Sequence, residues 1–257
     1  MIEFNLGFFD LLGEDLLEVV EESRKSGFIH APINTTFIAL IPKVDKPEEF
    51  DDFRMISLCN CLYKIILKVI NKRLKAVLST KISKEKFGFL QGRHIHETIG
   101  VAQEALHSLK AKNISGVVLK LDMSKAYDRV SWLYVRMLMI HLGFDVSFMR
   151  WVMGCISSAS FVVLINGAAS PFFKAERGLR QGSPLSPLIF LLVAEGLSRF
   201  FIDAARRGEL IGLVLAPGLN PTHLLFVDDI VLFCRGSKRD IDCLHRSLTL
   251  FKIATGM

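Results

Sequence analysis

The amino-acid sequence predicts a mixed α+β protein. Segments with the apolar spacing of helices alternate along the chain with short β-rich runs, and no internal repeat or long flexible linker separates them. Of the 257 residues, 51% are hydrophobic, which is enough to bury a sizeable core in one large domain or two small ones. We therefore expect a globular chain that combines helices and strands.

The first part of the chain is expected to contain two helices and one strand. Residues 10–25 have helical spacing and end near Gly27, a residue type that favours the left-handed turn after a helix. Residues 35–41 form a β-rich run that Pro42 closes. Residues 57–78 are predicted to form a helix with an apolar face and a basic face.

The middle of the chain is expected to alternate between helix and strand. Residues 96–110 have helical spacing, and residues 117–122 are rich in side chains that favour a strand. A further helix is predicted over residues 131–141, where Gly143 stops it.

The next part is expected to form a hairpin, a turn and a helix. Residues 161–165 and 172–175 are predicted to pair, because Asn166 and Gly167 supply the left-handed residues that a hairpin loop needs. A glycine-containing turn over residues 178–184 then leads into a strongly apolar helix over residues 187–202.

Two adjacent acids, Asp228 and Asp229, interrupt the apolar run 225–233. Burying an ionised carboxylate costs several kcal/mol or more unless a partner neutralises it, and neighbouring carboxylates also repel each other. The pattern predicts two short strands, 224–227 and 230–234, with the acids at the turn between them. Carboxylates at such a turn can bind one cation, and magnesium is the first candidate.

A third acid, Asp122, stands at the end of the predicted strand 117–122. Asp122, Asp228 and Asp229 would supply three carboxylates from two strands, enough for two magnesium ions about 4 Å apart in phosphoryl or nucleotidyl transfer. The alternative for a single Asp in this setting is a cap or turn residue, so the argument depends on the three acids together.

The charge of the chain is concentrated in one segment. The formal net charge is +6, yet residues 61–86 alone hold eight basic residues and one acidic residue. Four lysines at helical spacing there predict a basic helix face that follows the phosphates of a nucleic acid: Lys64, Lys68, Lys72 and Lys75. The alternative is an ordinary solvated face.

Seven blocks of the sequence resemble, in the same order, those of the reverse transcriptases of non-long-terminal-repeat retrotransposons, specifically plant elements of the LINE type. The resemblance covers nearly all of the chain. The blocks are FIALIPK (37–43), FRMISL (53–58), YKI (63–65), GFLQGR (88–93), DMSKAYD (122–128), RQGSPLSP (180–187) and FVDD (226–229).

The resemblance implies a right-hand polymerase fold, with an antiparallel palm sheet packed on helices. Residues 1–115 would form a fingers-like region that contains the N-terminal helix and the basic helix, and residues 116–257 a palm-like region. The implied activity is RNA-directed DNA synthesis, in which a dNTP is added to the 3′-hydroxyl of a DNA primer on an RNA template. Two magnesium ions would be bound by Asp122, Asp228 and Asp229, with the carbonyl of Met123 as an extra ligand.

The resemblance also implies the residues that bind the incoming nucleotide. Lys43 and Arg54 match the fingers residues that close over the triphosphate. Tyr127 matches the aromatic residue that packs under the sugar and excludes a 2′-hydroxyl. Gln181 and Gly182 match a turn that contacts the nucleotide and the template.

Three positions depart from the commonest family pattern. Met55 replaces a proline, Val227 replaces an alanine and Ser183 replaces an aspartate or cysteine, although none of these changes removes a metal ligand. Two rival interpretations remain open: a reverse transcriptase of a mobile group II intron, and a catalytically silent retrotransposon relic that at most binds nucleic acid.

The last residues, 250–257, resemble the helix that precedes a further palm strand and the thumb in this family. The chain is therefore expected to be a fingers-and-palm fragment that is truncated before the thumb and lacks the upstream endonuclease. Protein partners remain open.

The sequence favours an intracellular protein with no membrane partner. The longest comparable apolar run, 187–194, is shorter than the roughly 20 residues that span a bilayer, and the acidic residues among the first 15 do not suit a signal peptide. Five cysteines without a metal-binding spacing suit a reducing compartment, where they act as packing residues. The implied synthesis on chromosomal DNA suggests the nucleus.

Overall fold

The computed structural model describes residues 7–83, 86–87, 95–111, 115–165, 168–215, 220–226 and 228–257. The block GFLQGR (88–93), the predicted hairpin loop 166–167 and Val227 lie outside the described residues.

The chain forms two compact units, and each is built from two stretches. Unit 1 consists of Met1–Leu74 and Met139–Ser186, and unit 2 consists of Lys75–Leu138 and Pro187–Met257. The predicted fingers-like (1–115) and palm-like (116–257) regions are continuous stretches, and their assignment stays a prediction.

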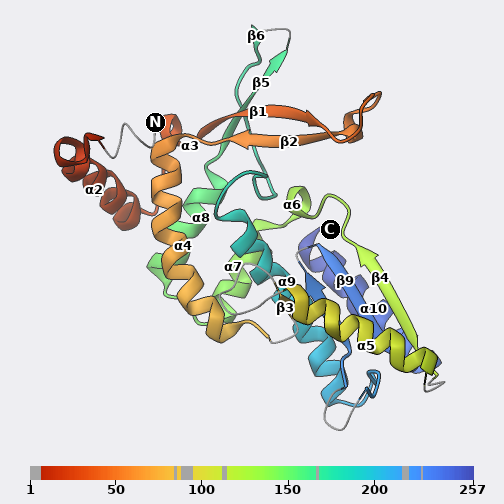
Figure 1. Ribbon diagram of the computed structural model, residues 1–257. Helices are drawn as coiled ribbons and strands as arrows, with labels where there is room; N and C mark the ends of the chain where they lie inside the picture. The colour runs from red at the N-terminus through yellow and green to blue at the C-terminus, as the bar shows by residue number, and fades with distance from the viewer. Residues whose placement is uncertain are drawn as a thin grey trace. The chain divides into compact units, whose positions relative to one another are not determined.

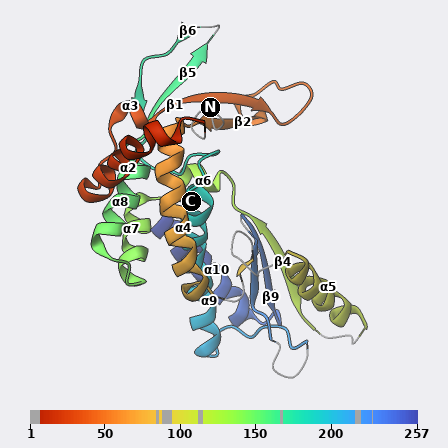
Figure 2. The ribbon, with the colours of Figure 1, turned by 60° about the vertical axis from the view of Figure 1, so that its left-hand side comes forward.

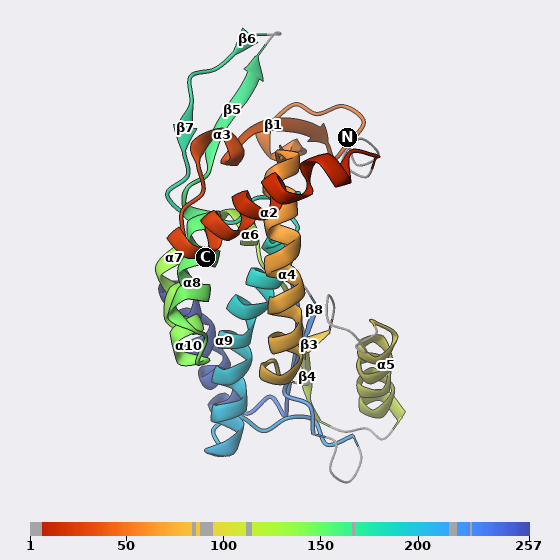
Figure 3. The ribbon, with the colours of Figure 1, turned by 90° about the vertical axis from the view of Figure 1, so that its left-hand side faces the viewer.

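Unit 1 contains a five-stranded sheet in the order β2-β1-β5-β6, with β7 also paired to β5. Strands β1 and β2 are antiparallel, whereas β1 and β5 are parallel. The predicted pairing of residues 161–165 with residues 172–175 is present, since β5 is antiparallel to β7 (Figure 3). Strand β5 is also antiparallel to β6. The strands are β1 (Thr35–Pro42), β2 (Phe53–Leu58), β5 (Ser160–Ile165), β6 (Ala168–Ala169) and β7 (Phe173–Lys174).

The helices of unit 1 carry many of its buried side chains, among them Ile66, Ile70 and Trp151. These helices are α2 (Phe9–Ser26), α3 (Ala31–Asn34), the 3-10 helix η1 (Phe50–Asp52), the first part of α4 (Cys61–Lys81) and α8 (Val146–Ser157).

Strand β2 corrects the prediction that a helix begins at Ser57. Ser57 pairs with Ile38 and Leu58 with Phe37 in the β1–β2 ladder, so both residues belong to the strand. Helix α4 begins only after Asn60, whose side-chain oxygen accepts a hydrogen bond from the backbone N–H of Leu62 at 2.9 Å. Such a cap at Asn is a common start of a helix.

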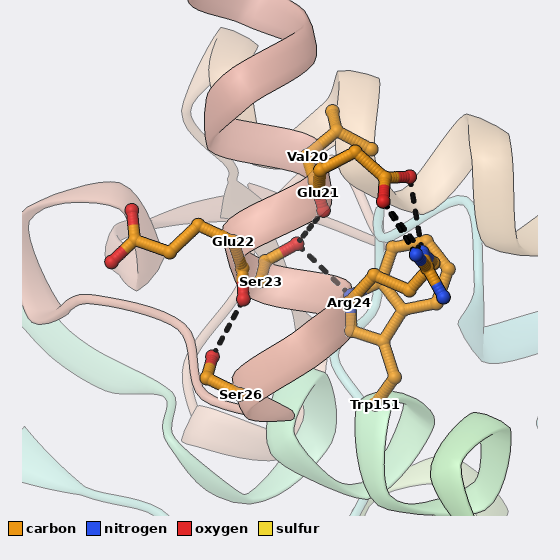
Figure 4. Close-up of polar contacts among 7 residues, drawn as sticks. All are labelled: Val20, Glu21, Glu22, Ser23, Arg24, Ser26 and Trp151. Carbon is orange, nitrogen blue, oxygen red and sulfur yellow. Dashed lines mark hydrogen bonds and ion pairs between the residues drawn. The ribbon is translucent and has the colours of Figure 1, made fainter.

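Helices α2 and α8 pack against each other around a buried tryptophan (Figure 4). The indole N–H of Trp151 donates to the hydroxyl of Ser23 at 3.0 Å, and that hydroxyl donates to the carbonyl of Val20 at 2.7 Å. A side chain at Gly154 would collide with the carbonyl of Gly27, so glycine there allows the two backbones to approach closely. Gly27 ends α2 in the left-handed conformation, as predicted.

Unit 2 contains a four-stranded sheet in the order β3-β8-β9-β4. The pairs β4–β9 and β8–β9 are antiparallel, in line with the antiparallel sheet that the resemblance implies, whereas the short β3 runs parallel to β8. The strands are β3 (Lys86–Phe87), β4 (Val117–Asp122), β8 (His223–Phe226) and β9 (Asp229–Cys234). The helices lying wholly or mainly in unit 2 are α5 (Ile95–Ala111), α6 (Ala126–Arg129), α7 (Trp132–His141), α9 (Ser186–Arg206) and α10 (Lys238–Thr255).

Helix α5 covers part of one face of the β8–β9–β4 ladder, while α9 and α10 lie on the other side (Figure 2). On the α5 side, Ala105 packs with Leu224 and Phe233 in a buried apolar cluster. On the α9 side, the ring of His223 contacts Phe201 at 5.1 Å between centroids. The mixed α+β prediction is therefore confirmed, and it takes the form of a sheet between helices in this unit.

A buried chain of polar groups fixes strand β8 to α9. The Nε2 atom of His223 lies 2.6 Å from the hydroxyl of Ser198, which lies 2.8 Å from the hydroxyl of Ser83. Ser83 also donates to the buried carboxylate of Glu195 at 3.0 Å, and Nδ1 of His223 lies 2.9 Å from the hydroxyl of Thr222. Buried polar groups that are satisfied in this way hold one arrangement, here that of the strand leading to Asp228.

In the part of the chain that the structure describes, no helix combines the length and apolar character needed to cross a membrane.

Candidate functional site

The structure places Asp122 and Asp229 opposite each other at one end of the unit 2 sheet, with Asp228 in the turn beside them. Strands β4 and β9 lie side by side (Figure 1). Asp122 is the last residue of β4 and Asp229 is the first residue of β9, and the two are direct partners in the antiparallel ladder. Asp228 lies in the turn just before β9. The backbone N–H of Met123 donates to the carbonyl of Asp228 at 3.3 Å, which ties the two acidic segments to each other.

The β4–β9 register explains why Asp122 is exposed rather than buried. Because side chains alternate along a strand, the partners Val118 and Phe233 share one face with the partners Asp122 and Asp229. Val118 and Phe233 pack with helix α5, whereas Asp122 lies beyond that contact and is exposed. The same sheet face therefore changes from apolar to charged toward the end of β4.

Lys120 is a residue of this face that the sequence analysis missed. Its ammonium lies 3.0 Å from Oδ1 of Asp229, with exposed side-chain fractions of 70% for Lys120 and 44% for Asp229. Ion pairs this exposed contribute about 0–1 kcal/mol. The signal that points to Lys120 is alternation, since it stands two residues before Asp122 and must share its face.

The donor set at this end of the sheet suits magnesium. Aspartate carboxylates and backbone carbonyls are the oxygen ligands that magnesium prefers. The ammonium of Lys120 forms an ion pair with one of these carboxylates, that of Asp229. The carbonyl of Met123 accepts a hydrogen bond from the backbone N–H of Ala126 at 3.2 Å, and a carbonyl oxygen has two lone pairs. Among the described residues, no three His, Cys, Asp or Glu side chains are gathered around one point.

Tyr127 lies close to the acids on the short helix α6. Its ring is half-buried and stacks on Phe190, with 4.9 Å between ring centroids. Burial, and next the nearby carboxylate of Asp228, raise the pKa of Tyr127 to about 12. Lys125 adopts the left-handed conformation (φ 53°), so the chain turns sharply between Asp122 and Tyr127.

Lys43 and Arg54 lie at the same end of the β1–β2 ladder in unit 1. Pro42 pairs with Phe53 there, so Lys43 follows β1 directly and Arg54 is the second residue of β2. Both side chains are exposed, and the Lys43 ammonium donates to the carbonyl of Asp51 at 2.6 Å.

The predicted turn at Gln181 and Gly182 packs on β2. The backbone N–H of Ser57 donates to the carbonyl of Gln181 at 2.8 Å. Gly182 has a φ of +94°, and a Cβ atom there would lie 3.0 Å from the carbonyl oxygen of Ser57. Glycine is therefore required both by the backbone conformation and by the close approach of the turn to the strand.

Arg180, just before this turn, is buried and was not singled out by the sequence analysis. Its guanidinium carbon lies 4.2 Å from the centre of the Tyr63 ring, and it donates to the hydroxyl of Thr36 at 3.2 Å and to the carbonyl of Cys155 at 3.3 Å. The Tyr63 hydroxyl donates to the same carbonyl at 2.9 Å. Burial raises the pKa of Tyr63 well above its usual value. These contacts anchor the start of the turn in the core of unit 1.

The basic face of α4 is present as predicted from the spacing, because its four lysines are exposed: Lys64, Lys68, Lys72 and Lys75. The opposite face is buried and includes Ile66, Leu67, Ile70 and Leu74. The binding of nucleic acid by this face stays a prediction.

The structure thus assembles two sets of predicted residues, each within one unit. Unit 2 brings Tyr127 next to the acids, and unit 1 packs the turn of Gln181 and Gly182 on the strand that holds Arg54.

Comparison with known proteins finds retrotransposon relatives. The chain is 31% identical over 232 residues to the "Transposon TX1 uncharacterized 149 kDa protein" of Xenopus laevis, covering 90% of this chain and 17% of that protein. It is 24% identical over 207 residues to the "Retrovirus-related Pol polyprotein from type-1 retrotransposable element R2" of Popillia japonica, covering 80% of this chain and 28% of that protein. The chain therefore spans less than a third of the length of either relative.

Comparison with solved structures finds the same fold in a telomerase. The apo telomerase of Candida tropicalis, truncated from its C-terminal domain, matches with a TM-score of 0.62 at 14% sequence identity. The match covers 88% of this chain and 49% of that chain. At this identity the likeness supports the polymerase fold alone.

The family profile described as "Reverse transcriptase (RNA-dependent DNA polymerase)" matches residues 41–254, which include every predicted catalytic and nucleotide-binding residue. This match covers well over half of the chain, and the relatives name transposons and a retrotransposable element. The chain belongs to the reverse transcriptase family, as a domain of the non-long-terminal-repeat retrotransposon type.

Proposed function

We propose that this chain carries out RNA-directed DNA synthesis, in which a dNTP is joined to the 3′-hydroxyl of a DNA primer on an RNA template. The observation that supports it best is the β4–β9 register, which pairs Asp122 with Asp229 while Met123 donates to the backbone of Asp228. From its seven sequence blocks we further propose a plant element of the LINE type that acts in the nucleus.

Asp122, Asp228 and Asp229 are proposed to hold two magnesium ions, with the carbonyl of Met123 as an additional ligand. When bound, the ions supply activation of the primer hydroxyl and stabilisation of the leaving pyrophosphate. The carboxylates would hold the ions at the end of the sheet where Asp122 is exposed and Asp228 and Asp229 are half-buried.

The residues that match the family's nucleotide-binding positions are proposed to contact the incoming nucleotide. The ammonium of Lys43 and the guanidinium of Arg54 suit the triphosphate, as a point charge and a planar fork. Gln181 and Gly182 offer an amide and an accessible backbone to the base and sugar. The Tyr127 ring, held by its stack on Phe190, excludes a sugar with a 2′-hydroxyl.

The template and primer are proposed to follow the basic face of α4. Each lysine that contacts a phosphate releases counterions, so binding should weaken steeply as salt increases.

Primer extension on an RNA template with magnesium tests this function. The wild-type chain is expected to extend the primer, and Asp228→Asn with Asp229→Asn is expected to abolish extension because the metal ligands are lost. Asp242→Asn is the matched control, since Asp242 is an exposed acid on α10 outside the site. Equal extension by the wild type and the double variant would contradict the proposal.

The second candidate is a silent relic that binds nucleic acid through the basic helix face. It is favoured if the wild-type chain gives no extension but binds RNA in a salt-dependent manner that a Lys68→Gln and Lys72→Gln variant loses.

A further inference from the structure

We propose that Lys120 is a positioning residue that holds Asp229 in the metal-free protein and is displaced from it by a divalent cation. This inference rests on the proposed function, because it assigns a role in metal binding to a residue outside the ligand set. It predicts that Lys120 and the metal compete for one carboxylate.

The strand geometry directs Lys120 at this carboxylate. Lys120 and Asp122 are two residues apart on β4, so their side chains share a face. Asp122 is the ladder partner of Asp229, and Lys120 is the partner of Val231. Lys120 is therefore the diagonal neighbour of Asp229, within reach of a long side chain, and its ammonium lies 3.0 Å from Oδ1.

Electrostatics explain why a cation belongs here before any metal binds. Asp122 and Asp229 are directly opposite each other on one face, an arrangement in which like charges destabilise a sheet. Asp228 adds a third carboxyl group next to them in the chain. The ammonium of Lys120 on Asp229 offsets part of this repulsion.

The exposure of Lys120 and Asp229 explains why a divalent cation can displace the ammonium from the carboxylate. With exposed fractions of 70% for Lys120 and 44% for Asp229, both groups keep much of their hydration when they separate. A divalent ion interacts with each carboxylate more strongly than a single ammonium, and it can bind Asp122 and Asp229 at once. The flexible lysine then moves into solvent at little free-energy cost.

Two consequences of opposite sign follow for the variant Lys120→Met. Without metal, the variant should be less stable than the wild type, because the repulsion between the acids is no longer offset. With metal, the variant should bind the ion more tightly, because the competing cation is gone. A lysine with only a structural role would change stability in the same way with and without metal.

Titration with Mn²⁺ alone, followed by electron paramagnetic resonance and by calorimetry, tests this competition. We expect Lys120→Met to lower the Mn²⁺ dissociation constant about two- to fivefold, since an exposed ion pair contributes at most about 1 kcal/mol. Lys120→Arg keeps the cation and should stay near wild type. Lys238→Met is the charge-matched control, because Lys238 is exposed and lies past the opposite end of β9.

The pairwise nature of the effect is tested in the Asp229→Asn background. There, Lys120→Met should change the dissociation constant less than twofold, because the shared carboxylate has become a neutral amide. Thermal melts in EDTA and in saturating Mn²⁺ give the second readout. Lys120→Met should melt below the wild type in EDTA and lose that deficit in Mn²⁺.

The outcomes separate this inference from the proposed function. If the wild type extends primers and binds Mn²⁺, but Lys120→Met binds it like Lys238→Met, the competition is refuted and the polymerase proposal stands. The competition is also refuted if Asp229→Asn leaves the Lys120→Met effect unchanged. If the wild type binds no Mn²⁺ at millimolar concentration, both proposals fail. Tighter Mn²⁺ binding by Lys120→Met in a chain without primer extension would support the competition alone.

Discussion

Replacing Gly182 by alanine should disturb the turn that packs on β2, and this single methyl group probes how tightly the predicted nucleotide-binding turn is built. Gly182 has a φ of +94°, a backbone conformation that residues with a Cβ atom rarely adopt. The added Cβ would also lie 3.0 Å from the carbonyl oxygen of Ser57 and 3.2 Å from Cγ2 of Ile56. Either the turn or the strand must move.

The expected loss of stability is the sum of these two effects. A left-handed conformation costs a residue other than glycine about 1–2 kcal/mol. Forcing a methyl group into a filled contact costs about 1–3 kcal/mol more, because neighbouring atoms must shift. The free energy of unfolding of Gly182→Ala should therefore fall by about 2–5 kcal/mol, and the hydrogen bond from Ser57 to the Gln181 carbonyl, 2.8 Å long, should weaken.

Gly143 provides a matched control in the same unit. It also has a positive φ (+71°), but a Cβ atom there would meet nothing within 4 Å. Gly143→Ala should therefore show only the backbone cost of about 1–2 kcal/mol.

Urea unfolding and thermal melts of the two variants measure the difference. For a domain of this size, 1 kcal/mol shifts the melting temperature by about 2–4 °C, so Gly182→Ala should melt roughly 2–12 °C below Gly143→Ala. The turn's contact with β2 would be irrelevant to stability if both variants melted together. In an active chain, Gly182→Ala should also raise the KM for dNTP, while Gly143→Ala should leave it unchanged.

Three further predictions follow from single contacts. Tyr127→Ala should admit ribonucleotides because the ring stacked on Phe190 is lost, whereas Tyr127→Phe should still exclude them. Single-nucleotide incorporation measures this, and unchanged selectivity of the alanine variant would refute the role of the ring in excluding the 2′-hydroxyl. Trp151→Phe should reduce the free energy of unfolding by about 1–3 kcal/mol, because the buried hydroxyl of Ser23 loses its hydrogen-bond donor. Urea unfolding measures this loss. The double variant with Ser23→Ala should lose less free energy of unfolding than the sum of the two single variants. Burial raises the pKa values of all three tyrosines and of the Cys155 thiol, so their contribution to stability is complete below about pH 9 and is lost as pH rises toward 12. The absorbance of ionised tyrosine should therefore appear together with unfolding. Its appearance near pH 10 in a chain that is still folded would contradict the burial.

Elements with a strong local signal were predictable from the sequence. Strand β4 has the predicted bounds of 117–122, and α5 differs from the prediction by one residue at each end. Gly27 ends α2 as predicted, and β1 runs through Pro42. In each case, the periodicity and the terminating residue are close together in the chain, so no distant contact is needed to define the element.

Strand β2 was not predictable in this way, because its partners are distant. Ser57 and Leu58 have no local sequence pattern that separates them from the apolar helix that follows. They are drawn into the sheet by pairing with β1, and Ser57 also donates to Gln181, more than a hundred residues later in the chain. Arg180 was missed for the same reason, since its partners Tyr63, Thr36 and Cys155 come from three other segments.

In the candidate site, too, the local features were predictable and the long-range pairing was not. The identities of Asp122, Asp228 and Asp229 follow from charges that interrupt apolar runs, but which of them face each other depends on the β4–β9 register. A slip of one residue would turn Asp122 to the opposite face, toward α9 and α10, and would move Lys120 with it. The observed register is held by apolar pairs such as Val118 with Phe233, which α5 covers. The apolar packing at one end of the ladder thus determines which charges meet at the other, so a Phe233→Ala variant that still folds should disturb metal binding without touching a single ligand.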